Sequence, residues 1–436
     1  MQTSPATAPR AVFYSETPTE SVVALPSLWA QVGKYRPQLV AALIILIVGI
    51  GLRLVPWFGV PDRLTMDEFL YMHNVRLLQV AGPSEYWTLA EHYVEVQAKT
   101  KDVMLPPTRC MYIVLGWTWD ALFHSGPQMA LRHVAAIFSC LSFLLSGLFA
   151  FRMGGARMAL VVGALMAVAP MELMTAHREL VDGVFGFWAL LSLWLLWENL
   201  QKPGRNPWLA AYAFAIAGMV LTKENAFFAA TALGGIVCVA AAFPGLKLGK
   251  VQWSTAVATF AGGLLGVAVL LSLAGNPQTL IEIYRLLVTK AEQMSFAYQT
   301  GGGPWYRYIV DLMLVSPAVL LPAIGGIFAL RKESREGIFL LLFVVIGCAV
   351  MVNVKNGMNL RYATMWDMPL RYLAAGTILQ LAGAVRKAPV LAAVVLVAAV
   401  GGIELHQYWQ IFVQKDIGEP VTQALMYGVG IVRPAL

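Results

Sequence analysis

The chain has 436 residues, of which 58% are hydrophobic and only 13% charged, and its mean hydropathy is +0.67. Soluble domains carry about 25% charged and about 45–50% apolar residues, so this composition predicts a polytopic membrane protein. It excludes a soluble enzyme, a secreted disulfide scaffold and a disordered chain. The net charge of +7 is scattered along the sequence, which argues against nucleic acid as a partner.

The first 37 residues are polar and lack the apolar core of a signal peptide, so we expect residues 1–37 to be a cytoplasmic N-terminal tail. Apolar runs long enough, or nearly long enough, to cross a bilayer follow the tail. Together they predict an all-α membrane helix bundle of about 11 spans. The runs lie near 38–60, 129–151, 157–173, 183–200, 208–222, 226–243, 252–274, 308–330, 337–354, 369–385 and 388–409.

The segment 105–123 is ambiguous, because it has about the right length for a span but opens with two prolines and carries Arg109 and Asp120. Short cytoplasmic loops collect Lys and Arg. If 105–123 does not span and the N-terminus is inside, every short basic loop falls on the cytoplasmic side. We therefore expect an interfacial helix on the outer surface. The basic loops contain Arg152, Arg157, Lys202, Arg205, Lys247, Lys250, Arg331, Lys332, Arg335, Arg386 and Lys387.

This topology divides the chain into a catalytic bundle over 38–385, and a last span with a short outer tail over 386–436. The bundle contains two long outer loops, 61–128 and 275–307. The second loop has an apolar stripe at helical spacing, which predicts an amphipathic interfacial helix followed by a glycine hinge at 301–303. The stripe consists of Leu280, Ile283, Tyr284, Leu287, Ala291 and Met294.

Carboxylates gather on the predicted outer side. Asp67 and Glu68 follow the first span, where a carboxylate can act as a general base. The alternative is that the pair simply caps the helix that follows, since acidic residues favour a first helical turn. Asp182 lies where two spans meet outside, and Arg178 and His177 beside it are expected to support a site or to form a helix-end ion pair.

Basic residues at the outer membrane surface run against the charge bias and call for a local anion. Arg132, Lys223 and Arg361, with Tyr362 beside the last, are candidates for binding a lipid phosphate. Lys355 and Arg371 flank the same region. For each cation, snorkelling to ordinary lipid headgroups is the alternative.

No motif indicates a metal or nucleotide site. The six histidines are dispersed without an HExxH pair, the four cysteines lie far apart, and no glycine-rich phosphate loop appears. No metal ligands are predicted from these patterns.

An ordered series of such features resembles the GT-C superfamily of membrane glycosyltransferases, in the branch of protein O-mannosyltransferases and lipid A aminoarabinose transferases. The series runs over roughly 40–385, and its order is more specific than any one piece. It consists of Arg53, Asp67-Glu68, Pro106-Pro107, Arg132, the RELVD stretch with Arg178 and Asp182, LTKE with Lys223, PWYRY at 304–308 and KNGMNLRYATMWDMP at 355–369.

The resemblance implies a donor sugar on a polyprenyl phosphate, used on the extracytoplasmic face by an inverting single displacement. It implies that Asp67 is the catalytic base with Glu68 beside it, and that Asp182 belongs to the same site. The residues it implies for the donor phosphate are Arg132, Lys223, Arg361 and Tyr362. Some relatives use a divalent metal ion and others do not, so the resemblance leaves that cofactor open.

The sequence departs from many relatives by ending soon after its last predicted span, without a large soluble domain. The acceptor, whether lipid, glycan or protein, is therefore left open. The expected location is a bacterial inner (plasma) membrane, in contact with membrane lipids. The alternatives are a non-catalytic GT-C-like assembly subunit, and a lipid or solute transporter, although no internal repeat is visible.

Overall fold

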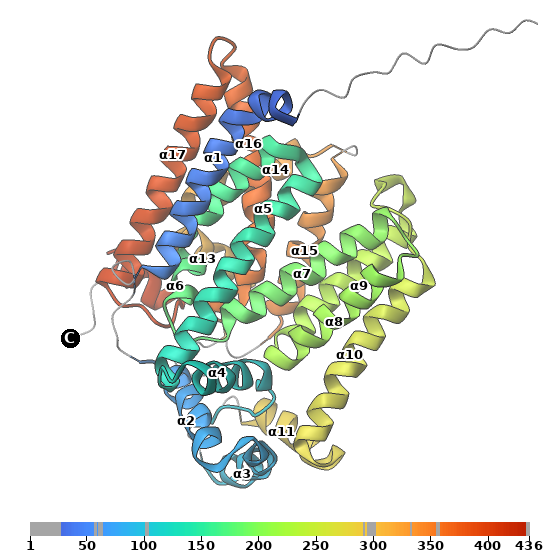
Figure 1. The fold of residues 1–436 in the computed structure, drawn as a ribbon, viewed down its shortest axis with the longest axis vertical. Coiled ribbons are helices and arrows are strands. Elements are labelled where there is room, and N and C mark those ends of the chain that lie inside the picture. The colour runs from blue at the N-terminus through green and yellow to red at the C-terminus, as the bar shows by residue number, and fades with distance from the viewer. Residues whose placement is uncertain are drawn as a thin grey trace, which may run out of the picture.

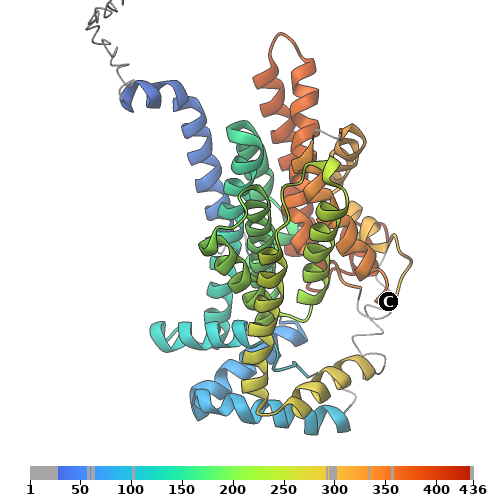
Figure 2. The same ribbon diagram turned by 90° about the vertical axis from the view of Figure 1, so that its right-hand side faces the viewer.

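The computed structural model describes residues 28–55, 59, 64–100, 104–290, 293, 302–331, 334–354 and 358–432. All regular elements in these ranges are helices, so the all-α fold class is confirmed. The predicted tail over 1–37 is described only from residue 28. There α1 already begins, and Pro37 lies inside the helix, where a proline can cause a kink. The first helix is bent in both ribbon views (Figures 1 and 2).

The longer helices lie side by side along the long axis of the molecule and form the predicted bundle (Figure 1). A helix occupies each of the predicted spans. In chain order these helices are α1 (Leu28–Leu54), α5 (Pro127–Ala167), α7 (Asp182–Gln201), α8 (Asn206–Thr222), α9 (Ala226–Ala242), α10 (Trp253–Ala274), α13 (Arg307–Val315), α14 (Pro317–Ala329), α15 (Arg335–Met351), α16 (Asp367–Ala384) and α17 (Pro389–Tyr408).

Three of the predicted runs differ in detail from the observed helices. The runs 129–151 and 157–173 are joined in α5, whose Gly155 has φ 75° and ψ −172°, a non-helical conformation that glycine adopts readily. The run 308–330 is divided into α13 and α14 at Ser316, immediately before Pro317. Proline disfavours helical backbone in the residue before it, which accounts for this break.

Five described helices are long and apolar enough to cross a membrane: Arg36–Leu54 of α1, all of α5, α7 and α10, and Pro389–Gln414, which is α17 with the π-helical turn η6 (Trp409–Gln414). α8, α9, α14 and α4 are shorter apolar helices. Burial identifies α7 as the central helix, because 83% of its apolar window is buried against 6% for Pro389–Gln414.

Four helices form a layer at one end of the bundle: α2 (Met66–Ala81), α3 (Tyr86–Lys99), α4 (Cys110–Phe123) and α11 (Pro277–Thr289). α4 lies across the bundle axis in both ribbon views, as expected for an interfacial helix (Figures 1 and 2). The bend of α5 and the α16–α17 connection, which carry predicted cytoplasmic basic residues, lie at the opposite end. We call α2, α3, α4 and α11 the end layer.

The predicted stripe of the second outer loop is half correct. Leu280 and Ile283 are buried, together with Leu286, whereas Tyr284 is exposed. α11 packs against both α3 and α10, and the face that it buries overlaps the predicted stripe but is shifted toward Leu286. Ala291, Met294 and Gly301 lie outside the described residues.

Arg53 joins α1 to the end of α5. Its buried guanidinium donates to Ser139 Oγ at 3.0 Å and to the carbonyl oxygens of Met166 and Ala167 at 2.8 and 3.1 Å, and it lies 5.0 Å from the Phe143 ring centroid. The last carbonyls of a helix have no partner within the helix, so a cation there is favourable. Arg53 therefore holds α1 and α5 together rather than facing the end layer.

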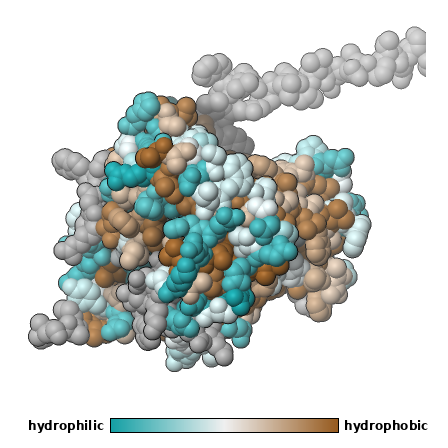
Figure 3. Space-filling model, turned by 90° about the horizontal axis from the view of Figure 1, so that it is seen from below, coloured by the Kyte–Doolittle hydropathy of each residue, from teal (hydrophilic) through white to brown (hydrophobic). Residues whose placement is uncertain are grey.

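The remaining described helices are short: η2 (Pro83–Glu85), α6 (Pro170–Ala176), η3 (Pro244–Leu246), η5 (Leu360–Trp366) and α18 (Thr422–Gly428). η5 leads directly into α16. The face of the molecule that carries the end layer is mixed in character: hydrophilic side chains gather across its middle, with hydrophobic ones between them (Figure 3).

Candidate active site

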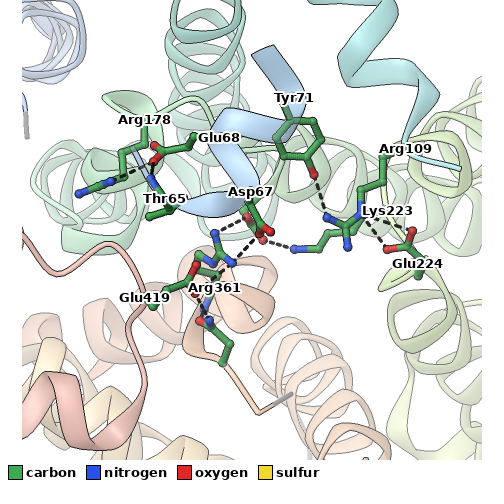
Figure 4. Close-up of polar contacts among 12 residues, drawn as sticks. Thr65, Asp67, Glu68, Tyr71, Arg109, Arg178, Lys223, Glu224, Arg361 and Glu419 are labelled. Carbon is green, nitrogen blue, oxygen red and sulfur yellow. Dashed lines mark hydrogen bonds and ion pairs between the residues drawn. The ribbon is translucent and has the colours of Figure 1, made fainter. Parts of the chain in front are cut away.

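The start of α2 points its two acidic side chains in different directions (Figure 4). Glu68 accepts a hydrogen bond from the backbone N–H of Thr65 at 2.6 Å, which closes the first turn of the helix. The same oxygen of Glu68 lies 3.2 Å from Nη1 of Arg178. Glu68 thus does what the capping alternative proposed, and Asp67 is left free to face another group.

Asp67 faces Arg361, which comes from the η5 turn between α15 and α16. Nη2 of Arg361 donates to Asp67 Oδ2 at 3.0 Å. The same nitrogen lies 3.0 Å from Glu419 Oε2, and Nη1 lies 3.9 Å from Asp182 Oδ2. Asp67 and Asp182, separated in the sequence, therefore meet at one guanidinium, as the prediction of a shared site required.

Lys223 completes the cluster on the other side of Asp182. It is the C-cap residue of α8, and its Nζ donates to Asp182 Oδ1 at 2.5 Å. The ammonium also lies 4.4 Å from the centroid of the Tyr362 ring, a favourable cation–π contact. Four of the predicted site residues, Asp182, Lys223, Arg361 and Tyr362, are thus in contact. With Asp67 and Glu419 they form what we call the Asp67 cluster.

A second polar group borders this cluster. Arg109, the residue before α4, lies 3.0 Å from Glu224 Oε2 and donates to the Tyr71 hydroxyl at 2.9 Å. The hydroxyl of Thr108 donates to Glu224 Oε1 at 2.7 Å. Because Tyr71 lies on α2, one turn after Asp67, these bonds fix the Pro106–Pro107 turn and α4 beside the Asp67 cluster (Figure 4).

Charge around Asp67 determines its protonation. Although burial opposes ionisation, the cations Arg361, Arg109 and Lys223 lower the pKa of the Asp67 carboxyl below its usual value. Glu419 behaves oppositely, because burial and the neighbouring Asp67 raise its pKa while Arg361 opposes the rise. Two neighbouring carboxyls whose pKa values are pushed apart are suited to different roles in proton transfer.

The other predicted site residues lie outside the Asp67 cluster. Arg132 pairs with Glu179 at 2.8 Å, and His177 Nε2 lies 2.7 Å from the carbonyl oxygen of Leu52. Burial and the neighbouring Glu68 raise the pKa of Glu179 to about 7, although Arg132 opposes the rise. Arg178 contacts Glu68 and Asp416 rather than Asp182, at 3.2 and 2.7 Å. Lys355 lies outside the described residues.

Arg371, the other flanking cation, lies deeper in the bundle. Its guanidinium pairs with Asp367 at 2.7 Å and with Glu404 at 2.8 Å, and all three side chains are buried. Through Glu404 this pairing ties α16 to α17, and it follows the η5 turn that presents Arg361. Arg371 therefore supports the site through the bundle and does not contact Asp67.

Sequence reasoning missed three members of the site: Arg109, Glu224 and Glu419. Glu419 lies in the Lys415–Val421 segment between η6 and α18, which the sequence indicated only as an outer tail. The available signal was charge, since Glu419 and Asp416 are acidic residues on the predicted outer side. Among the described residues, no group of three or more His, Cys, Asp and Glu side chains is arranged to hold a metal ion.

Residues 114–274 match the family of dolichyl-phosphate-mannose-protein mannosyltransferases. The chain is also similar to ArnT from Cupriavidus metallidurans in the apo state, with a TM-score of 0.53 and 16% identity over 92% of this chain and 78% of that one. The chain has the GT-C fold. The expected resemblance to the branch of O-mannosyltransferases and ArnT is therefore confirmed. Sequence comparison with curated proteins gives no match.

Two further structures with the GT-C fold were solved with ligands. ArnT from Cupriavidus metallidurans bound to undecaprenyl phosphate has a TM-score of 0.51 and 16% identity, again over 92% of this chain and 78% of that one. AglB from Archaeoglobus fulgidus, an oligosaccharyltransferase in complex with an inhibitory peptide and a dolichol-phosphate, has a TM-score of 0.54 and 14% identity over 87% of this chain. The chain spans about half of that archaeal protein, 55% of its length.

Proposed function

We propose that this GT-C chain is an integral membrane glycosyltransferase that moves a sugar from a polyprenyl-phosphate donor to an acceptor on the extracytoplasmic face. The observation that carries the proposal is the Asp67 carboxylate, partly open to solvent and held 3.0 Å from Arg361 beside the buried Asp182–Lys223 pair. The family match and the ligand of the ArnT structure support the donor class.

In the proposed reaction, an acceptor hydroxyl or amine attacks the anomeric carbon while Asp67 takes its proton. The bond between that carbon and the phosphate oxygen breaks, and the electron pair stays on the phosphate. Since attack and departure occur on opposite faces of the carbon, a single displacement inverts the anomeric configuration. The low pKa of Asp67 keeps the base ionised at neutral pH.

Cations beside the base would balance the charge of the departing phosphate. Lys223, Arg361 and Arg109 come from three elements and surround Asp67, and Tyr362 lies against Lys223. Arg132 remains a candidate for the donor lipid at a separate position, with its partner Glu179. Glu68, Arg178 and His177 would act indirectly, because they fix the start of α2 and the α6–α7 connection.

The basic loops at the far end of the bundle support placing the site on the outer side, with the N-terminus in the cytoplasm. The proposed membrane is the bacterial inner membrane. The proposed domains are the catalytic bundle over 38–385 and a last span with its outer segment over 386–436. The proposed acceptor is a lipid, glycan or protein that meets the open side of Asp67.

The test uses membranes and liposomes that contain the full chain and a polyprenyl-phosphate donor with a radiolabelled sugar. We expect label to leave the donor lipid and appear on an acceptor supplied by the membranes. Movement of the intact labelled lipid between leaflets would instead indicate a transporter. If correctly folded protein neither transfers the label nor moves the lipid between leaflets, the result would favour a non-catalytic subunit. Mass spectrometry of glycans from cells with and without the protein then identifies the product.

A further inference from the structure

Both cations of the Asp67 cluster are buried, whereas two of its three carboxylates, Asp67 and Glu419, are partly open to solvent. The side chains of Arg361 and Lys223 are only 1% and 2% exposed, whereas Asp67 and Glu419 are 22% and 26% exposed. An anionic group that approaches from solvent therefore meets carboxylate oxygens before it meets a cation. This arrangement is unexpected for a site that has to receive a phosphate.

The Asp67 cluster carries a net negative charge. Three carboxylates, those of Asp67, Asp182 and Glu419, contact two cations, Arg361 and Lys223. With all five groups ionised the cluster carries a charge of −1. The neighbouring Arg109 is itself paired with Glu224. A phosphate can form a direct ion pair with the Arg361 guanidinium only if it displaces a carboxylate that already contacts it.

Of the three carboxylates, Glu419 is the one that can most easily be displaced from the Arg361 guanidinium. Its Oε2 contacts Arg361 at 3.0 Å and also accepts a hydrogen bond from Asn359 Nδ2 at 2.6 Å. It would therefore keep a hydrogen-bond partner after leaving the guanidinium. Asp182 lacks this freedom, because it is buried and is the ion-pair partner of the buried Lys223. Asp67 is the proposed base and has to stay in the site.

The Lys415–Val421 segment that carries Glu419 is attached to the site at two other points. The backbone N–H of Leu360 donates to the carbonyl oxygen of Pro420 at 3.2 Å. Asp416 pairs with Arg178 at 2.7 Å, so the segment also contacts the connection between α6 and α7. These bonds hold the segment beside Arg361 through contacts that do not involve the Glu419 side chain.

We infer that Glu419 is an internal anion that competes with the donor phosphate for Arg361 and thereby sets how tightly the site holds polyprenyl phosphate. The inference rests on the proposed function. Transfer breaks the bond between sugar and phosphate, which converts a phosphodiester into a monoester with one more ionisable oxygen. The return of Glu419 to Arg361 then lowers the affinity for this more negative product and favours its release.

The experiment measures binding of undecaprenyl phosphate to the full chain in detergent micelles or nanodiscs. Glu419→Gln keeps the size of the side chain and an oxygen for Asn359 but removes the competing charge. We expect its Kd for undecaprenyl phosphate to be about tenfold lower than that of the unaltered protein. Glu419→Ala, which removes the contact with Arg361 altogether, should show at least the same gain.

The matched control is Glu95→Gln, which removes one negative charge from an exposed position of α3 that pairs with Lys99. Its Kd should not change. An equal gain in this control would assign the effect to overall charge and overturn the inference. Unchanged or weaker binding by both Glu419 variants, with melting temperatures near that of the unaltered protein, would also overturn it. If neither the unaltered protein nor any variant binds undecaprenyl phosphate at saturating concentration, the proposed function fails as well.

Discussion

Replacing Asp67 by asparagine should abolish sugar transfer while leaving the fold intact. Arg361 keeps Glu419 at 3.0 Å and Asp182 at 3.9 Å, and the new amide oxygen can still accept a hydrogen bond. Because Asp67 is partly exposed, losing its ion pair should cost about 1 kcal/mol or less of the free energy of unfolding. Loss of a general base should lower the transfer rate by roughly 10²- to 10⁴-fold.

Asp182→Asn is the matched comparison, because it makes the same chemical change on the same cluster. Here both partners are buried, and Lys223 would keep only the face of the Tyr362 ring and a neutral amide. Leaving a buried charge without its counter-ion costs about 3–5 kcal/mol. We therefore expect Asp182→Asn to lower the apparent melting temperature clearly, in addition to any loss of transfer.

Two measurements on the same preparations separate these outcomes: the apparent melting temperature in detergent, and the rate at which labelled sugar leaves a polyprenyl-phosphate donor. Asp67→Asn should melt near the unaltered protein and show almost no transfer. Transfer within tenfold of the unaltered rate would remove Asp67 as the base. A melting temperature of Asp67→Asn as low as that of Asp182→Asn would show that the difference in burial has been overestimated.

Three other substitutions test the supports of the site. Arg53→Lys should lower the apparent melting temperature, because one ammonium cannot replace the several hydrogen bonds of the guanidinium; an unchanged value would contradict this. Since the pKa of Glu179 is raised from its ordinary 4.5 to about 7, the folded state holds a proton that the unfolded chain releases. Stability should then fall as pH rises from about 5 to 7, and Glu179→Gln should flatten that fall in a series of melting curves. Gly418→Ala would place a methyl group 2.6 Å from Thr65 Cγ2 and 3.1 Å from Arg178 Nη1, so it should cost about 1–3 kcal/mol by denaturation.

The sequence was sufficient to predict the bundle and the central pair of carboxylates. Apolar runs of about 20 residues have few alternatives to membrane helices, and the basic loops then decide which ends face the same way. With that topology, Asp67 and Asp182 had to lie at one end of the bundle. Their meeting at Arg361, 294 residues after Asp67, is consistent with this simple constraint.

Sequence patterns could not reveal which partner each charge would take. The sequence pattern indicates Arg109 only as a reason why 105–123 does not cross the membrane, but Arg109 binds Glu224, 115 residues further along the chain. Lys223 and Glu224 are neighbours, yet α8 ends between Thr222 and Lys223 and their side chains join different ion pairs. Such choices depend on how helix ends dock, which residue spacing along one segment does not contain.

Neutralisation of Arg361 requires several distant parts of the fold to be in place at once. Its guanidinium is buried, and its counter-ions come from α2, the start of α7 and the Lys415–Val421 segment. Removing a cation from water without any counter-ion costs several kcal/mol, so burial of Arg361 depends on the docking of these elements, although two counter-ions remain when one is lost. The end layer and the Lys415–Val421 segment therefore stabilise the site jointly. A change that loosens either one should weaken the position of the guanidinium, even where it touches neither Asp67 nor Asp182.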